Sequence, residues 1–129
     1  MRDSNPKVHE YLINRDKYFI NAQEFASRGE FRKASEFLWG AIALQIKLLA
    51  LIKKNIGLGR HEDIRRFIKE LSKELGDEEI RKSFEVLEKL HVNFYDEIIS
   101  SEDFEFYLIE GFNFMKRLED LMRKNSEKC

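Results

Sequence analysis

The sequence predicts an all-α protein, an up-and-down antiparallel bundle of about five helices. One long stretch, residues 30–53, is apolar from Phe37 to Ile52, where only Gly40, Gln45 and Lys47 interrupt it. The chain has one Pro and 6 Gly, so its turns are few and its helices are long. Glu, Lys, Leu, Ile and Phe dominate the composition and no strand pattern occurs, which favours helix throughout.

Residues 30–53 are predicted to form a central helix that the other helices cover. Apolar side chains occupy nearly its whole circumference, as in a helix buried in a core or in a membrane. Its apolar run, Phe37 to Ile52, is shorter than the roughly 20 residues that span a bilayer, and it contains Gln45 and Lys47. We therefore expect the core helix of a soluble bundle and no membrane span.

A first helix is predicted from Pro6 to about Arg28. Proline suits the first turn of a helix, and Asn5 can cap it. Gly29 should end this helix in a left-handed conformation. Since Gly29 almost adjoins the central helix, the two helices should form an antiparallel hairpin.

Three further helices are expected after a glycine-containing turn at 56–59. They cover residues 61–75, 78–98 and 102–124, the first ended by Gly76 and the others capped by Asp77 and by Ser100 or Ser101. Residues 6–124 should therefore form one domain, with flexible tails at 1–5 and 125–129.

Charge, cysteine and histidine content limit the possible functions. The formal net charge of −1 gives the whole chain no attraction to nucleic acid, although a local patch could have one. The one Cys, Cys129, is the last residue, so neither an internal disulfide nor a cysteine zinc site is expected. His9, His61 and His91 lack the spacing of helical metal ligands, and no phosphate-binding glycine loop occurs. We expect no metal, no cofactor and a cytoplasmic protein, since no signal peptide opens the chain.

The last predicted helix is more apolar than a peripheral helix of a monomer requires. Besides its inward stripe it carries Phe106, Ile109 and Phe112. Such a surplus indicates a self-association surface. We therefore expect a homodimer that uses this helix or the face carrying His91.

Small residues at Ala22, Ala34 and Ala41 flank the turn between the first two helices and resemble one tetratricopeptide hairpin. A solenoid needs at least about three such units, and the sequence contains one. The alternatives are two bundle helices that cross closely, or a single-hairpin protein-interaction adaptor.

Basic residues gather between positions 53 and 73. Arg65, Arg66 and Lys69 are candidate binding residues, because basic side chains on one helix face can contact RNA phosphates. Interleaved acidic residues, such as Glu70, leave a solvated charged face as the alternative.

Residues 90–95, LHVNFY, place an imidazole, an amide and a phenol within two helical turns. His91 could act as general acid or base in RNA cleavage through the ribose 2′-hydroxyl, with Asn93 or Tyr95 positioning the phosphate. His91 and Tyr95 are also one turn apart, so they could instead satisfy each other's hydrogen bonds in a bundle or dimer seam.

Two motifs carry a family resemblance: Ala34-x4-Trp39-Gly40-Ala41 and His91-x-Asn93-Phe94-Tyr95. With them, roughly residues 10 to 122 resemble the small archaeal single-domain branch of the HEPN superfamily (higher eukaryotes and prokaryotes nucleotide-binding). The resemblance implies a helical bundle, often dimeric. Many members are metal-independent RNases of toxin–antitoxin, defence or RNA-processing systems, and they often work beside a minimal nucleotidyltransferase.

In active members an Arg stands shortly ahead of the motif His, and both meet across the dimer. His91 matches the motif His, but the positions where the Arg would stand are Phe84, Glu85 and Val86. We therefore predict a HEPN-like nucleotide- or RNA-associated binding domain, catalytically weak or inactive, in a toxin–antitoxin or defence-type module with a nucleotidyltransferase-type partner. The alternatives are a metal-independent endoribonuclease that uses His91 and a tetratricopeptide-like adaptor.

Overall fold

The computed structural model describes residues 5–91 and 99–127 of the chain. These ranges contain five helices and no strand, so the predicted all-α class is confirmed. The helices are α1 (Pro6–Ser27), α2 (Phe31–Lys54), α3 (His61–Leu75), α4 (Glu78–Leu87) and α6 (Ser101–Glu127).

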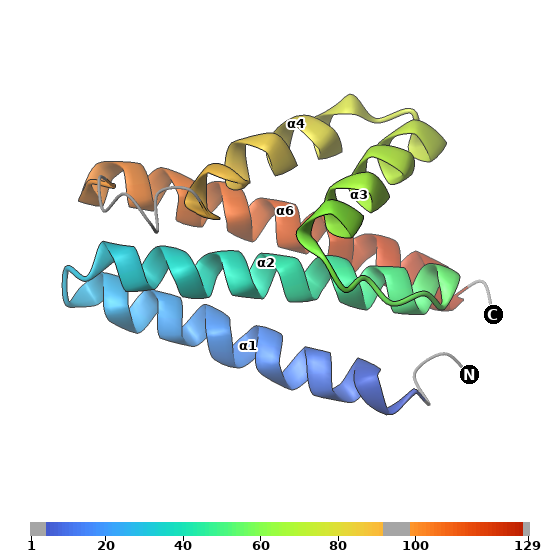
Figure 1. Ribbon diagram of the computed structural model, residues 1–129, viewed down its shortest axis with the longest axis horizontal. Coiled ribbons are helices and arrows are strands. Elements are labelled where there is room, and N and C mark those ends of the chain that lie inside the picture. Colours follow the sequence, from blue (N-terminus) through green and yellow to red (C-terminus); the bar gives the residue numbers. More distant parts are fainter. Residues whose placement is uncertain (1–4, 92–98, 128–129) are drawn as a thin grey trace.

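Helix α2 lies at the centre of the bundle (Figure 1). It packs most extensively against α1, then against α6, and it also contacts α3. Helices α3 and α4 contact each other and cover the side of α2 and α6 that faces away from α1.

Helix α2 contributes more buried apolar residues to the core than any other described helix, as expected of a central helix. Leu38, Ile42, Ile46 and Leu49 have no exposed surface. In the described part of the chain, α2 is also the one helix long and apolar enough to cross a membrane by length and composition, and 56% of its most apolar window is buried. Packing of α1, α3 and α6 around α2 is the arrangement expected of a core helix.

Helices α1 and α2 cross closely at small residues. Ala22 and Ala34 are fully buried between them. A Cβ atom added to Gly40 would lie 2.9 Å from the ring of Tyr18, closer than real contacts allow. The turn between the helices contains Gly29 at a φ of +78°, the left-handed conformation predicted for it.

The connection from α2 to α3 turns back on itself. Asn55 takes a left-handed conformation with φ 55° and ends α2. Residues 55–60 then run back along α2, so α3 begins near the middle of α2 rather than at its end (Figure 1). Helix α3 has the predicted bounds and ends at Gly76, which is also left-handed.

Helix α4 is shorter than predicted. The helix expected through residue 98 ends at Leu87, Glu88 forms a turn, and residues 89–91 are helical again, while the expected part at 92–98 lies outside the described residues. The predicted inward residues Phe84, Leu87 and Leu90 are nonetheless buried on both sides of this turn. The turn lets the Glu88 carboxylate reach α3, and three hydrogen bonds there compensate for the interrupted helix.

Helix α6 begins as predicted and extends further than expected. Ser100 caps it, because its Oγ accepts a hydrogen bond from the Asp103 backbone N–H at 3.1 Å. Phe104, Leu118 and Met122 are buried along its inner face. The helix continues to Glu127, into the segment predicted to be a tail.

Candidate functional site

Two histidines far apart in the sequence lie side by side. His61, Arg65, Glu88 and His91 surround one recess, which we call the His61–His91 site. Helix α3 contributes the first two residues, and the turn after α4 contributes the other two. Trp39 of α2 lies against both imidazole rings.

The start of α3 fixes the direction of His61 and Arg65. Helix α3 begins at His61, after Arg60 in an extended conformation. The Asp63 carboxylate accepts a hydrogen bond from the Arg60 backbone N–H at 3.1 Å and caps this end. Arg65 follows His61 by four residues, so both side chains project from the same face of the helix.

Glu88 joins α3 to the turn after α4. Its Oε2 accepts hydrogen bonds from Arg65 Nη2 at 2.8 Å and from Arg65 Nε at 3.0 Å. The same oxygen lies 2.7 Å from Nε2 of His61. An ionised carboxylate only accepts, so Nε2 of His61 is the donor in this contact.

The two imidazole rings are stacked. The centroids of His61 and His91 are 5.3 Å apart, with an angle of 15° between the planes. The centroid of Trp39 lies 5.4 Å from that of His61 and 5.9 Å from that of His91. The Trp39 ring is tilted by 40° to His61 and by 33° to His91, so the three rings form an aromatic, partly polar cluster beside the Arg65 guanidinium.

Two adjoining recesses surround these groups. The recess at the His61–His91 site has a volume of about 270 Å³, and Glu85 and Lys89 complete its lining. A second recess of about 230 Å³ shares Arg65, Glu85 and Glu88 with it and extends to Lys69. Both are smaller than the roughly 300–1,000 Å³ of typical small-molecule pockets, so they suit parts of a larger, extended ligand.

Many basic side chains near these recesses are engaged locally. Arg81 bonds Glu78 and Glu85, each at 2.6 Å. Through its hydrogen bond and its charge, Arg81 lowers the pKa of Glu78 below the ordinary value. Arg66 lies 3.8 Å from Asp63 in an ion pair. The basic segment at 53–73 is therefore not one continuous positive surface.

The structure places only some of the predicted site residues at the recesses. His91 and Arg65 line the same recess, and Lys69 lines the adjoining one. Arg66 lines neither of these recesses. Asn93 and Tyr95 lie outside the described residues.

Sequence reasoning missed His61 and Glu88 as site residues and named Trp39 as part of the family motif, not as a site residue. The signals were the four-residue spacing of His61 and Arg65 and the three-residue spacing of Glu88 and His91. Neither spacing shows that the two pairs meet. Within the described residues, no three His, Cys, Asp or Glu side chains converge as metal ligands.

The fold and the site define a small all-helical protein with a partly exposed pair of histidines. Residues 10–110 match the archaeal PaREP1/PaREP8 family, so the chain belongs to this family. Its fold is similar to the crystal structure of a protein from Sulfolobus solfataricus, with a TM-score of 0.71 and 21% identity over 83% of this chain and 94% of that chain. No curated protein matches the sequence. The archaeal family agrees with the archaeal resemblance, whereas HEPN membership stays a prediction.

Proposed function

We propose that this protein binds single-stranded RNA or nucleotides at the His61–His91 site and acts by binding. The observation that carries the proposal is the stack of His61 on His91, 5.3 Å apart, in the recess that Arg65 also lines. Single-stranded RNA is recognised by stacking of its bases on flat side chains and by cationic contacts to its phosphates. This site offers both within one recess.

Arg65 keeps donors for a phosphate while it bonds Glu88. Its Nε and Nη2 donate to the carboxylate. An Arg side chain has five N–H donors in all, and about half of the Arg65 side chain is exposed. A phosphate can therefore bind on the outer side of the guanidinium without breaking the contact to α4.

The family resemblance supports the same site. His91 matches the motif histidine, and the motif arginine is absent from positions 84–86. Arg65 comes from another helix, yet it lines the same recess as His91. It supplies a cationic group beside the histidine, in the role that the resemblance assigns to the missing arginine.

Two matched arginine variants test the proposal. Arg65→Gln and Arg66→Gln remove the same charge from adjacent positions, but only Arg65 lines the recess. Anisotropy of a labelled single-stranded RNA should show affinity reduced roughly tenfold by Arg65→Gln, and less than about twofold by Arg66→Gln. Binding should also weaken between about 50 and 200 mM salt. Equal effects of the two variants, or no RNA binding by the wild type, would refute the proposal.

A metal-independent endoribonuclease is the second candidate. The observation that favours it is the pair of adjacent imidazoles, because one can take a proton from the ribose 2′-hydroxyl while the other donates to the leaving oxygen. The test is cleavage of a mixed RNA substrate in EDTA by the wild type, His61→Ala and His91→Ala. Cleavage that either substitution abolishes would establish the nuclease, and intact RNA in every sample would leave a binding protein.

The remaining predictions depend on the cellular context. A toxin–antitoxin or defence role and a nucleotidyltransferase-type partner follow from the resemblance. A tetratricopeptide-like adaptor stays the alternative from another class. RNA binding that depends on Arg65 would argue against an adaptor, which needs no such site.

A further inference from the structure

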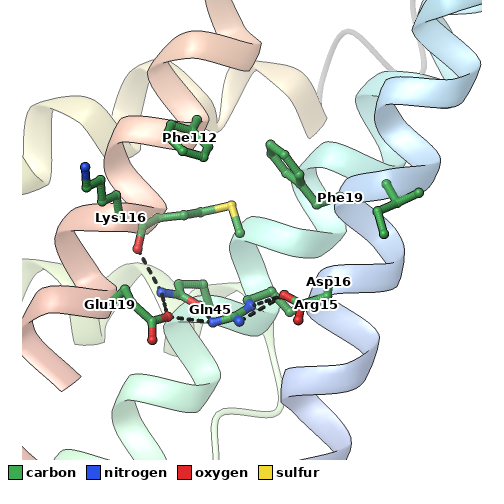
Figure 2. Close-up of a pocket in the computed structure, with 9 residues that line it drawn as sticks. Arg15, Asp16, Phe19, Gln45, Phe112, Lys116 and Glu119 are labelled. Atoms are coloured by element: carbon green, nitrogen blue, oxygen red, sulfur yellow. Dashed lines mark hydrogen bonds and ion pairs between the residues drawn. The ribbon is translucent and has the colours of Figure 1, made fainter. Parts of the chain in front are cut away.

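A second and larger hollow lies on another side of the molecule. It has a volume of about 550 Å³ and is bordered by α1, α2 and α6. Figure 2 shows Phe19 of α1 and Phe112 of α6 on its two walls, with Gln45 of α2 at its floor. We call this hollow, together with the outer faces of α1 and α6 beside it, the α1–α6 groove.

Large apolar side chains are exposed on both walls of the groove. On α1, Ile13 and Ile20 are 53% and 54% exposed. On α6, Phe106, Ile109 and Phe112 are 53%, 57% and 52% exposed. They follow helical spacing, so each wall carries one apolar stripe. Exposed apolar stripes of this extent mark contact surfaces with other macromolecules.

The polar groups at the floor of the hollow bond one another. Nη1 of Arg15 donates to Gln45 Oε1 at 2.7 Å and to Glu119 Oε1 at 2.8 Å. Nε2 of Gln45 donates to the Met115 carbonyl at 2.8 Å. These bonds, drawn in Figure 2, leave little for a small polar ligand to recognise.

Size also argues against a small molecule. Only Ile20 and Phe112 of the exposed apolar residues line the hollow. A ligand confined there would leave Ile13, Phe106 and Ile109 in water. A partner that covers all five must therefore extend well beyond the hollow, as a macromolecule does.

We propose that the partner is a second copy of this chain. Both walls are apolar, and each adds one exposed charge to the hollow: Asp16 on α1, which Arg15 bonds at 2.9 Å on one side, and Lys116 on α6. These two exposed charges are opposite and can pair between copies. A two-fold axis along the groove would set α1 of each copy against α6 of the other. The same surface then serves both copies, as an isologous interface requires.

The charges match in this arrangement. Arg15 bonds Glu119, and the ring centroids of Phe19 and Phe112 are 6.1 Å apart. These two contacts fix which residues of α1 and α6 lie at the same height along the groove. Asp16 and Lys116 therefore lie at about the same height along the groove. A two-fold rotation about an axis along the groove leaves the height of every residue along that axis unchanged. Lys116 therefore meets Asp16 of the other copy, and Phe112 meets Ile20 of the other copy.

This interface would leave the His61–His91 site free. That site is built on α3 and the turn after α4, which cover the side of the bundle away from α1 (Figure 1). The arrangement differs from the one that the HEPN resemblance implies, in which catalytic residues of two copies meet. Dimerisation and RNA binding are therefore separable properties, and the proposal does not rest on the proposed function.

Charge reversal tests the interface. The wild type should be a dimer by light scattering coupled to gel filtration and by sedimentation. Asp16→Lys or Lys116→Glu alone should weaken the dimer by at least about a hundredfold, because symmetry repeats each like-charge contact. The double variant Asp16→Lys/Lys116→Glu restores the opposite charges and should restore the dimer. Lys82→Glu, an exposed residue of α4, is the control and should stay dimeric.

Three results would overturn the proposal. In the first, the wild type is a monomer. In the second, both single charge reversals leave the dimer intact. In the third, the single reversals dissociate the dimer and the double variant does not restore it. Circular dichroism of each variant identifies any loss of helix, which the rescued double variant also controls for. RNA affinity measured on the same proteins reports on the His61–His91 site independently.

Discussion

Two polar networks of this molecule hold helices together in opposite settings. Between α1, α2 and α6, Arg15 bonds Gln45 and Glu119, and only 13% of its side chain is exposed. Between α3 and the turn after α4, Glu88 bonds His61 and Arg65, and about half of the Arg65 side chain is exposed. The two networks therefore differ in their arginines, since the Arg15 guanidinium is largely buried and the Arg65 guanidinium is not, whereas Glu119 and Glu88 are both partly exposed, at 33% and 18%.

The setting decides what each network can do. A buried polar group that loses its partner costs the full desolvation free energy, so the Arg15 network should contribute mainly to stability and to the choice of one packing. An exposed ion pair adds little to stability, because water replaces either partner. The Glu88 network can therefore exchange contacts for a ligand at little cost, as a binding site must.

The largest expected effect is the difference in unfolding free energy lost when each of two phenylalanines of α6 is replaced by alanine. Phe114 is buried against Phe84 of α4, with ring centroids 6.5 Å apart, whereas Phe112 is half exposed beside the α1–α6 groove. Phe114→Ala should lower the free energy of unfolding by about 3–5 kcal/mol. Phe112→Ala should lower that of the monomer by less than about 1 kcal/mol. Urea denaturation at low protein concentration measures both, and similar losses would show that Phe112 is a core residue.

The next effect compares the two networks directly with one type of substitution. Arg15→Met should lower the free energy of unfolding by about 2 kcal/mol, because Gln45 Oε1 loses the Arg15 donor and Glu119 keeps only the 3.4 Å contact from Gln45 Nε2. Arg65→Met should lower it by less than about 1 kcal/mol. Denaturant midpoints with unchanged slopes test this pair. If Arg65→Met were the more destabilising, the Glu88 network would be structural and its role as a binding site would fail.

The smallest effect compares two glycines. A Cβ atom at Gly40 would meet the Tyr18 ring, whereas one at Gly57, in the connection to α3, would have no atom within 4 Å. Gly40→Ala should therefore destabilise by about 1–2 kcal/mol through overpacking between α1 and α2. Gly57→Ala should be neutral or slightly stabilising, since it restricts the unfolded chain. Thermal denaturation of both variants checks the sign, and a neutral Gly40→Ala would contradict the close crossing.

The fold could be predicted because its signals are local. The apolar circumference of α2, the caps at Asn5 and Asp77, and the glycines that end α1 and α3 all act within a few residues. Helix α4 was predicted too long: it ends beside Glu88, whose carboxylate bonds His61 and Arg65, residues that lie more than twenty positions earlier. No local pattern contains that information.

The candidate site was predictable only in part, for the same reason. His91 and Arg65 were recognised one at a time, from a family motif and from a basic segment. Their common recess depends on the reversed connection at 55–60, which sets the start of α3 over Trp39. The exposed apolar residues of α6 were predictable, because their surplus is visible within one helix.

The contact between Arg15 and Glu119 also bears on how the chain is made. The two residues are 104 positions apart, so their contact forms only when nearly the whole chain has been synthesised. The α1–α2 hairpin is complete much earlier, and N-terminal elements fold first during synthesis. Gln45 gives the nascent hairpin a polar group on the face that α6 will later cover. We expect an amide at this position, rather than another leucine, to make the nascent chain less prone to aggregate while that face is still in contact with water.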